Sequence, residues 1–420
     1  MPVDPSFEWL EASQGRGIVP GLGRMERLLD ALNHPERLLR CLHVAGTNGK
    51  GSVCAFAESV LRASGLRTGL YTSPHLVRFT ERIRINGEEV EGSLIKEGIG
   101  RLRAATAGWD EVEMPTYFEL VTALAFDLFA RADLDVIVLE TGLGGRLDAT
   151  NTAPKLACAV TPIGLDHTEW LGTTLGEIAR EKAGIFRPAV PAVTAPQEPE
   201  ALAVLSSEAA RTGATLRVVW DPLPPGMSLG LAGPHQRGNA ALALDLIQAG
   251  GFSPPQEAIS RGLAGVSWPG RFQRLVHNGV ELVLDGAHNP HAARQLLFAW
   301  REVFGDLRPV LVFGALADKD PEAMLGTLLP LASEVRLVPV SSPRSLDPAV
   351  IAGRISRMSP LFTGYSHPSP IVFGSLGEAL EGISGGAPSP APAVLVAGSL
   401  FLVGEALALV SGGRFAPRSQ

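Results

Sequence analysis

The stretch Val44-Ala45-Gly46-Thr47-Asn48-Gly49-Lys50-Gly51-Ser52 decides how the N-terminal half of this chain folds. It joins an apolar run, residues 38–44, to a segment with helical periodicity, residues 52–64. A glycine-rich loop between a strand and a helix lets backbone N–H groups point at phosphates, and the helix adds the positive end of its dipole. Such a loop could be a simple turn, but with Lys50 at its end it predicts a nucleotide site.

Within this phosphate loop, Lys50 is expected to reach the β- and γ-phosphates, and Ser52 to offer a hydroxyl to the phosphates and their magnesium. The common pattern has glycine where Val44 stands and serine or threonine where Gly51 stands, so the match is to a variant. The predicted nucleotide-binding residues here are Asn48, Gly49, Lys50, Gly51 and Ser52.

Further apolar runs at residues 135–139 and 156–162 predict buried strands, and residues 118–131 have helical periodicity. Uniformly apolar strands that alternate with helices predict a parallel sheet covered on both faces. A second α/β pattern follows the Pro269-Gly270 pair, with strands expected at residues 281–284, 310–313, 335–338 and 393–397. Residues 222–234 and 384–392 are expected to be loops.

We therefore predict an α/β fold with two domains. Residues 1–270 should form an ATP-binding domain with a parallel sheet, the phosphate loop and a substrate site. Residues 271–420 should form a smaller, Rossmann-like α/β domain. The length of 420 residues agrees with two domains, because it exceeds what one hydrophobic core usually supports.

Composition excludes several classes of function. The net charge of -7 disfavours a general nucleic-acid binder, which needs a basic surface. The sequence begins without a basic segment followed by an apolar one and contains no run of 18 apolar residues, so we expect a cytoplasmic protein without membrane spans. Its three cysteines, Cys41, Cys54 and Cys158, form no CxxC pair and are expected to be small buried side chains.

Acidic residues and a histidine follow two of the predicted strands. Glu140 closes the run 135–139, and Asp166 and His167 follow the run 156–162. Ligands of open α/β sheets bind at the carboxyl ends of the strands. Carboxylates there suit magnesium, although imidazole is an uncommon ligand for this ion. From these residues alone, Glu140 could instead cap a turn, and His167 could cap a helix or lie in the core.

Several longer segments resemble motifs of the folylpolyglutamate synthase/dihydrofolate synthase family of the Mur ligase superfamily. They are residues 46–52, 71–82, 139–151 and 165–172, and they occur in the family's order. The resemblance implies an ATP- and magnesium-dependent ligase, with two magnesium ions. It also implies the metal ligands Ser73, Glu140 and His167.

The resemblance also gives a role to Lys182, in Ile178-Ala-Arg-Glu-Lys182. A helical lysine is ordinarily a solvated charge, but the family's lysine at this position is carbamylated by CO2. Carbamylation requires a neutral amine, so nearby cations or burial should lower the pKa of Lys182. The implied catalytic residues are Lys50, His167 and Lys182.

Other matching segments imply contacts with ATP and with the acceptor. Asn239 corresponds to the family's adenine contact, Arg271 to a phosphate contact and Asp285 to a ribose contact. Residues 114–119 resemble the family's pterin-contact segment. The implied substrate-binding residues are Arg82, Thr116, Tyr117, Phe118 and His288. Segments 341–345 and 398–403 follow C-terminal strands and could approach the incoming glutamate.

The implied reaction joins L-glutamate to a folate, or to dihydropteroate, in a monomeric enzyme. A folate carboxylate attacks the γ-phosphate of ATP, and the amine of glutamate then displaces phosphate from the acyl phosphate. One alternative is a Mur-type ligase for peptidoglycan precursors, which usually has a further domain before its phosphate loop; here the loop begins at residue 44. Another is a non-catalytic nucleotide-binding relative, which would not need Lys50, Glu140, His167 and Lys182 together. The choice between dihydropteroate and folate acceptors stays open.

Overall fold

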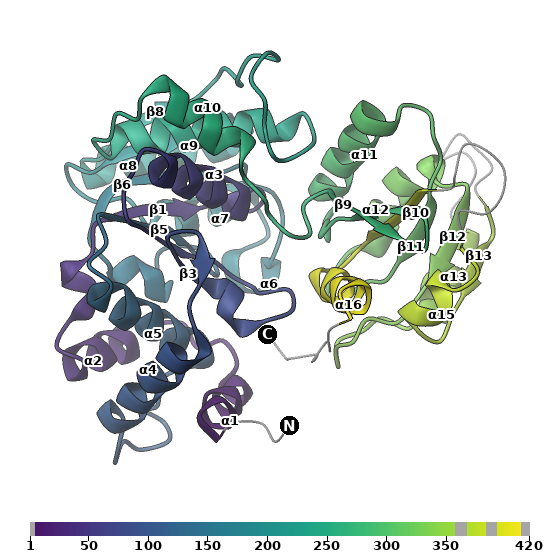
Figure 1. Cartoon of the computed structure of the whole chain (residues 1–420). Helices are drawn as coiled ribbons and strands as arrows, with labels where there is room; N and C mark the ends of the chain where they lie inside the picture. Colours follow the sequence, from purple (N-terminus) through teal and green to yellow (C-terminus); the bar gives the residue numbers. More distant parts are fainter. Residues whose placement is uncertain (1–4, 358–367, 384–392, 413–420) are drawn as a thin grey trace. The chain divides into compact units, whose positions relative to one another are not determined.

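Figure 1 shows a computed structural model of the chain, which describes residues 5–357, 368–383 and 393–412. The chain divides into two compact units. Unit 1 consists of Met1–Gly230 and Gln236–Val266, and unit 2 of Leu231–His235 and Ser267–Ser419. The boundary predicted at residue 270 lies just after the end of unit 1, whereas nothing in the sequence predicted that Leu231–His235 joins unit 2.

Unit 1 is built on an eight-stranded sheet with the order β4-β3-β2-β5-β1-β6-β7-β8. All neighbours from β2 to β8 are parallel, which agrees with the predicted parallel sheet, although only β1, β5 and β6 among these strands were predicted. The strands β3 and β4 are antiparallel, which was not predicted. The turn Asn86–Gly87 between them has positive φ at both residues, and such a two-residue turn joins antiparallel strands. The strands are β1 (Cys41–Ala45), β2 (Thr68–Tyr71), β3 (Ile83–Ile85), β4 (Glu88–Glu89), β5 (Val136–Glu140), β6 (Lys155–Val160), β7 (Pro191–Thr194) and β8 (Thr215–Val218).

Helices flank this sheet on both sides, with α3, α9 and α10 on one side and α2, α4 and α5 on the other (Figure 1). The helices predicted at residues 52–64 and 118–131 correspond to α3 and α5. The helices are α1 (Pro5–Ala12), α2 (Gly23–Ala31), α3 (Lys50–Ala63), α4 (Gly92–Ala105), α5 (Tyr117–Arg131), α6 (Thr168–Leu171), α7 (Leu175–Ala183), α8 (Pro199–Thr212), α9 (His235–Ala249) and α10 (Gln256–Ala264).

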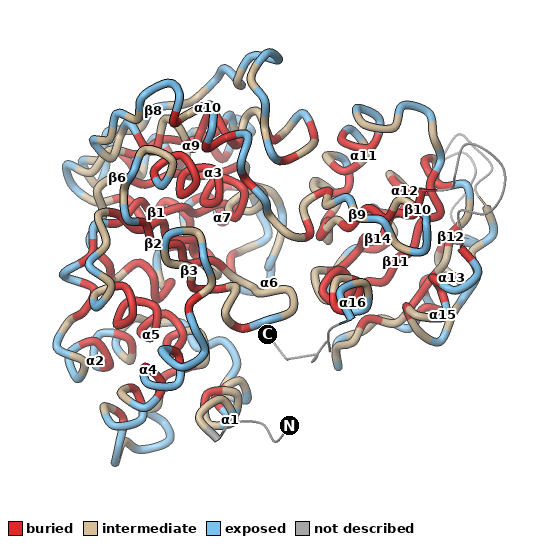
Figure 2. Tube along the Cα trace, in the orientation of Figure 1, coloured by how far each residue is buried: buried red, intermediate tan, exposed pale blue. Residues whose placement is uncertain are grey.

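The central strands of unit 1 are buried along their whole length (Figure 2). All five residues of β1 and all five of β5 are buried, which explains why their sequences are mostly apolar. His43 and Glu140 are the polar exceptions in these two strands. The three cysteines are free and buried, which confirms their prediction as small core side chains.

Unit 2 has a six-stranded sheet with the order β13-β12-β11-β14-β10-β9. It is parallel except for β9, which forms a hairpin with β10 through Asn278 and Gly279 at positive φ. The four predicted strands correspond to β10, β11, β12 and β14. The predicted loop 384–392 lies outside the described residues. The strands are β9 (Gln273–His277), β10 (Val280–Leu284), β11 (Val310–Phe313), β12 (Glu334–Leu337), β13 (Pro370–Val372) and β14 (Ala393–Ala397); the helices are α11 (Pro290–Phe304), α12 (Pro321–Leu328), α13 (Pro348–Arg357), α15 (Leu376–Leu380) and α16 (Leu400–Val410).

Candidate active site

The phosphate loop leaves β1 at Ala45 and enters α3 at Lys50. Gly46 and Gly49 both have positive φ, at 145° and 90°. A Cβ atom at Gly46 would overlap Thr161 Oγ1, and one at Gly49 would lie 2.7 Å from Asn239 Oδ1. Both positions therefore require glycine for their backbone conformation and for the close approach of a neighbour. The predicted adenine contact, Asn239, lies directly against the loop.

Two lysines donate to the same carbonyl of the phosphate loop. Lys50 Nζ lies 3.2 Å from Gly46 O, and Lys182 Nζ lies 2.7 Å from the same oxygen. Lys182 is buried, with 4% of its surface exposed. Burial, and then the charge of Lys50, lower the pKa of Lys182 to about 7. Two amines beside a loop of backbone N–H groups form an arrangement that attracts a polyphosphate.

The predicted metal ligands Ser73 and Glu140 meet at the ends of neighbouring parallel strands. The backbone N–H of Ser73, after β2, donates to Glu140 Oε2 over 3.2 Å. Glu140 is buried, and both it and Lys50 shift the pKa of the buried Cys54 thiol on α3. The carboxylate therefore lies within electrostatic reach of the start of α3, next to the phosphate loop.

This pair fits a magnesium ion, because a carboxylate and a hydroxyl are oxygen donors and magnesium usually keeps further positions for water and phosphate. Among the described residues, no group of three or more histidine, cysteine, aspartate or glutamate side chains could hold a metal ion. A magnesium ion at Glu140 and Ser73 would thus depend on oxygen atoms of the nucleotide and water as well.

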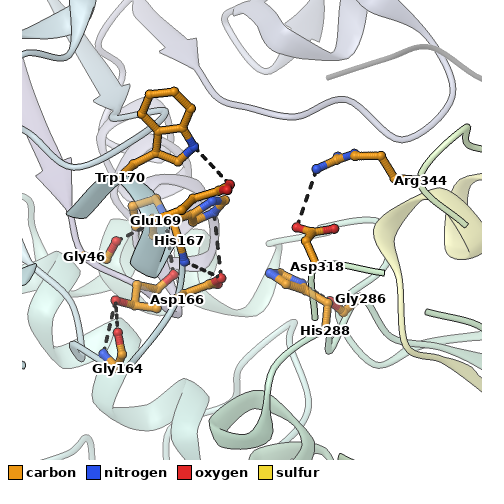
Figure 3. A network of polar contacts seen from close by, with 12 residues as sticks. Gly46, Gly164, Asp166, His167, Glu169, Trp170, Gly286, His288, Asp318 and Arg344 are labelled. Atoms are coloured by element: carbon orange, nitrogen blue, oxygen red, sulfur yellow. Dashed lines mark hydrogen bonds and ion pairs between the residues drawn. The ribbon is translucent and has the colours of Figure 1, made fainter. Parts of the chain in front are cut away.

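The segment containing Asp166 and His167 is attached to the other side of the phosphate loop (Figure 3). Thr47 Oγ1 donates to Gly164 O and accepts from Gly164 N, each over 3.1 Å. His167 has a left-handed backbone with φ of 50°, and 44% of its side chain is exposed. Because β1 lies between β5 and β6, Glu140 and His167 extend from strands on either side of the phosphate loop.

Asp166, which the sequence placed beside His167 but which was not among the predicted site residues, orients this segment. Its Oδ1 atom accepts from the His167 backbone N–H over 2.9 Å, and it lies 3.9 Å from His167 Nε2. The negative charge of Asp166 also raises the pKa of Lys182, opposing the effect of burial. Asp166 directly precedes His167 in the segment 165–172, and this position was the signal in the sequence that could have identified it.

Arg82 is a buried cation beside an aromatic ring. Its Nε atom donates to His75 Nδ1 over 2.7 Å, and its guanidinium carbon lies 5.6 Å from the centre of the Tyr117 ring. Only 3% of Arg82 is exposed, and no acidic side chain in the described part of the chain pairs with it. A buried guanidinium without a carboxylate partner is suited to an anionic ligand. His75 was not predicted, although it lies in the same segment as Ser73 and Arg82.

The neighbouring predicted substrate residues have clear structural contacts. Thr116 caps α5, because its hydroxyl accepts from Glu119 N while the Glu119 carboxylate accepts from Thr116 N. Phe118 packs against the loop that follows Glu140, where a Cβ at Gly142 would lie 2.5 Å from the Phe118 ring. The predicted acceptor segment and the predicted metal loop are therefore in contact within unit 1.

In unit 2, the predicted residues Arg271, Asp285 and His288 gather around Gly286. Asp285 accepts from the backbone N–H groups of Phe272 and Ala287, and His288 Nδ1 lies 2.7 Å from Gly286 O. A Cβ at Gly286 would lie 2.5 Å from an Arg271 guanidinium nitrogen. Burial raises the pKa of Asp285, and the charge of Arg271 partly offsets this rise.

The residues expected near the incoming glutamate have partners inside unit 2. Ser341 Oγ donates to Glu405 over 2.8 Å, and Arg344 forms an ion pair with Asp318 at 3.5 Å (Figure 3). Ser399 caps α16 by accepting from Phe401 N. A role for them in glutamate binding stays a prediction.

Comparison with known proteins identifies relatives along most of the chain. The family model "Mur ligase, glutamate ligase domain" matches residues 270–400. The dihydrofolate synthase/folylpolyglutamate synthase of Bacillus subtilis is 37% identical over 366 residues, covering 80% of this chain and 85% of the relative. The Escherichia coli protein of the same name is 37% identical, covering 82% of this chain and 83% of the relative.

Solved structures agree with this relationship over nearly the full length. The structure of E. coli FolC in complex with DHPP and ADP has a TM-score of 0.84 and 32% identity, covering 98% of each chain. The Yersinia pestis bifunctional folylpolyglutamate synthase/dihydrofolate synthase with AMPPNP and Mn ion has a TM-score of 0.84 and 33% identity, covering 97% of this chain and 98% of that one.

The two α/β units, the phosphate loop and the matched C-terminal model define an ATP-dependent ligase of the Mur ligase type. No helix in the described ranges is long and apolar enough to cross a membrane. The chain belongs to the dihydrofolate synthase/folylpolyglutamate synthase family.

Proposed function

We propose that this enzyme uses ATP to join the amino group of L-glutamate to a carboxylate of a folate, and that dihydropteroate is also an acceptor. The observation that carries the proposal is the 37% identity to two curated relatives, both named as dihydrofolate synthase and folylpolyglutamate synthase. The phosphate loop with Lys50 and Lys182, and the buried Arg82 in the same unit, which has no carboxylate partner among the described residues, support it.

In the first step, an oxygen of the acceptor carboxylate attacks the γ-phosphorus of ATP. The new P–O bond forms as the bond to the β-phosphate breaks, so ADP leaves and an acyl phosphate remains. Lys50 and the backbone N–H groups of the loop offset the negative charge on the transferred group. Asn239 is proposed to contact the adenine, Arg271 the phosphates and Asp285 the ribose.

In the second step, the glutamate amine attacks the activated carbonyl carbon and loses a proton. The C–O bond of the tetrahedral intermediate then breaks and inorganic phosphate leaves. Arg82 would hold an anionic group of the acceptor, with Tyr117 and Phe118 beside its flat ring system and His288 as a further substrate contact. Burial of Arg82 strengthens such a contact, because water does not compete for the guanidinium.

Ser73 and Glu140 would hold one magnesium ion, and His167 with a carbamylated Lys182 a second. Bound magnesium supplies positive charge that neutralises the phosphate oxygens during transfer. Carbamylation joins the Lys182 nitrogen to the carbon of CO2 and releases a proton, which requires the neutral amine. The pKa of Lys182, at about 7, supports this modification, because much of the amine is neutral near physiological pH.

The test is ADP release by the purified protein with ATP, magnesium and L-glutamate, comparing dihydropteroate with tetrahydrofolate. Release with both acceptors, dependent on glutamate, supports both activities; release with tetrahydrofolate alone removes the dihydropteroate part. Lys50→Ala should reduce ADP release by about 100-fold or more. Lys96→Ala, which changes an exposed lysine on α4, is the matched control and should behave like the wild type. No ADP release with either acceptor would refute the proposal.

We also propose that the enzyme works as a monomer in the cytoplasm, where its substrates ATP and glutamate occur. Its three free cysteines agree with a reducing compartment. Size-exclusion chromatography with light scattering tests the first part, and a dimer mass would contradict it. Fractionation of cells tests the second, and recovery outside the cytoplasmic fraction would contradict that part.

A further inference from the structure

A buried histidine lies beneath the phosphate loop, in the middle of β1. His43 is fully buried, and its Nε2 atom lies 2.8 Å from Thr150 Oγ1. Thr150 belongs to the short 3-10 helix Ala149–Thr152, and its hydroxyl lies 2.5 Å from Asp148 Oδ1. These three side chains form a continuous buried chain of hydrogen bonds between residues that are 107 positions apart in the sequence.

The direction of this chain follows from the chemistry of its members. Asp148 faces four donors, which are the backbone N–H groups of Gly142, Leu143 and Thr150 and the Thr150 hydroxyl. Burial raises the pKa of Asp148, but these hydrogen bonds oppose the rise by favouring the charged form. As a carboxylate Asp148 only accepts hydrogen bonds, so the Thr150 hydroxyl gives its single proton to Asp148. The Thr150 oxygen is then free to accept, and His43 must carry its proton on Nε2.

The surroundings keep His43 neutral in this tautomer. Burial lowers the pKa of His43 well below its ordinary value, and the charges of Lys155 and Arg187 lower it further. His43 Nδ1 is buried and has no hydrogen-bond partner. His43 therefore makes one directed hydrogen bond, and that bond points at Thr150.

At its other end, the chain of hydrogen bonds holds the loop that follows Glu140. Asp148 Oδ2 accepts from both Gly142 N and Leu143 N over 2.9 Å, which folds residues 141–148 back on themselves. Gly142 is also the residue against which Phe118 packs. On the β1 side, His43 is three residues before Gly46, to which Lys50 and Lys182 donate.

We propose that His43 is a positioning residue, which acts through Thr150 and Asp148 to hold the 141–148 loop, and with it Glu140, in a set position relative to the phosphate loop. The expected effect of His43 on the rate of ADP release rests on the proposed function, whereas its expected effect on the 141–148 loop does not. The His43 side chain is fully buried, and its one hydrogen bond goes to Thr150. It ties the strand that carries the phosphate loop to the loop that begins with the Glu140 carboxylate.

Two substitutions at the same site separate a directed hydrogen bond from simple packing. His43→Gln keeps an N–H donor near the Nε2 position, whereas His43→Leu removes the donor and leaves an apolar side chain. Leu42→Ala is the matched control, because Leu42 is equally buried on the same strand and lies outside the chain of hydrogen bonds. Thr150→Val removes the same connection from its other side.

The first readout is hydrogen–deuterium exchange of the amides of Gly142, Leu143 and Thr150 in the intact protein. We expect His43→Leu and Thr150→Val to speed their exchange by about 10-fold or more, and His43→Gln and Leu42→Ala to leave it within about 2-fold. The second readout is steady-state kinetics of ADP release. The kcat of His43→Leu should fall by about 10- to 100-fold, with KM for ATP within about 2-fold of the wild type and recovery in His43→Gln.

Wild-type exchange at these three amides in both His43→Leu and Thr150→Val would overturn the inference. An equal increase of the exchange rate in His43→Gln and His43→Leu would also overturn the inference, because a change in packing alone would then explain the faster exchange. If His43→Leu does not fold, Thr150→Val tests the same hydrogen bond by the same exchange measurement. A wild-type protein that releases no ADP would remove the proposed function, while the exchange data would still decide whether His43 orders the loop.

Discussion

Replacing Lys182 with methionine should inactivate the enzyme and, below pH 7, make its fold more stable. Lys182 is almost completely buried, and its pKa falls from 10.5 to about 7. A pKa shift of one unit corresponds to about 1.36 kcal/mol. The lowered pKa of Lys182 therefore means that the protonated amine costs the folded state roughly 5 kcal/mol. Methionine fills a similar space without a charge. It loses the hydrogen bond to Gly46 O, worth about 1 kcal/mol, but Lys50 still donates to that oxygen.

We therefore expect Lys182→Met to be more stable than the wild type by about 2–4 kcal/mol at pH 6. The sign of the pH dependence follows from the two pKa values. Between about 7 and 10.5 the unfolded chain keeps the Lys182 proton and the folded chain releases it, so wild-type stability rises with pH by about 1.4 kcal/mol per unit. The advantage of the variant is complete below pH 7 and disappears as the pH approaches 10.5.

Urea denaturation at pH 6, 7.5 and 9, in buffers free of CO2, measures this difference. Lys96→Met is the control, because it removes an exposed lysine and should give no such trend with pH. A Lys182→Met variant that is less stable than the wild type at pH 6 would refute the reasoning. So would a stability difference that stays constant from pH 7.5 to pH 9.

Three further substitutions test the site. Gly49→Ala should destabilise the fold by about 1–3 kcal/mol in thermal unfolding and raise KM for ATP, because its φ is 90° and the new methyl group would lie 2.7 Å from Asn239 Oδ1. Gly100→Ala on α4, where a Cβ atom would meet nothing within 4 Å, is the control and should instead stabilise the fold by about 0.5–1 kcal/mol. A Gly49→Ala variant that unfolds at a higher temperature than Gly100→Ala would contradict this reasoning. Glu140→Gln should lower ADP release by about 10-fold or more at saturating ATP while the melting temperature holds; unchanged turnover would remove Glu140 from the metal site. Arg82→Leu should raise KM for the folate acceptor by about 10-fold or more with KM for ATP unchanged, and equal changes in both constants would contradict a role in acceptor binding.

Much of the fold could be predicted because burial leaves a local pattern in the sequence. Strands β1 and β5 are covered on both faces, so each is a nearly continuous apolar run, and the glycines of the phosphate loop mark the turn between β1 and α3. The short hairpin strands β3 and β9 were missed. The Asn86-Gly87 and Asn278-Gly279 turns were a readable signal for both hairpins, but β3 has only three residues and the residues of β9 alternate between more and less buried instead of forming an apolar run.

For the candidate site, the sequence by itself determined the residue types and their order along the chain. It determined Lys50 in a glycine-rich loop, Glu140 and His167 after buried strands, and Lys182 on a later helix. The tertiary structure alone decided which of these groups meet. Lys182 shares Gly46 O with Lys50 across 136 residues, and His43 reaches Asp148 through Thr150. Local patterns report the backbone conformation and burial of a segment. Distances and pKa values depend on which distant segments pack together and how much water they exclude.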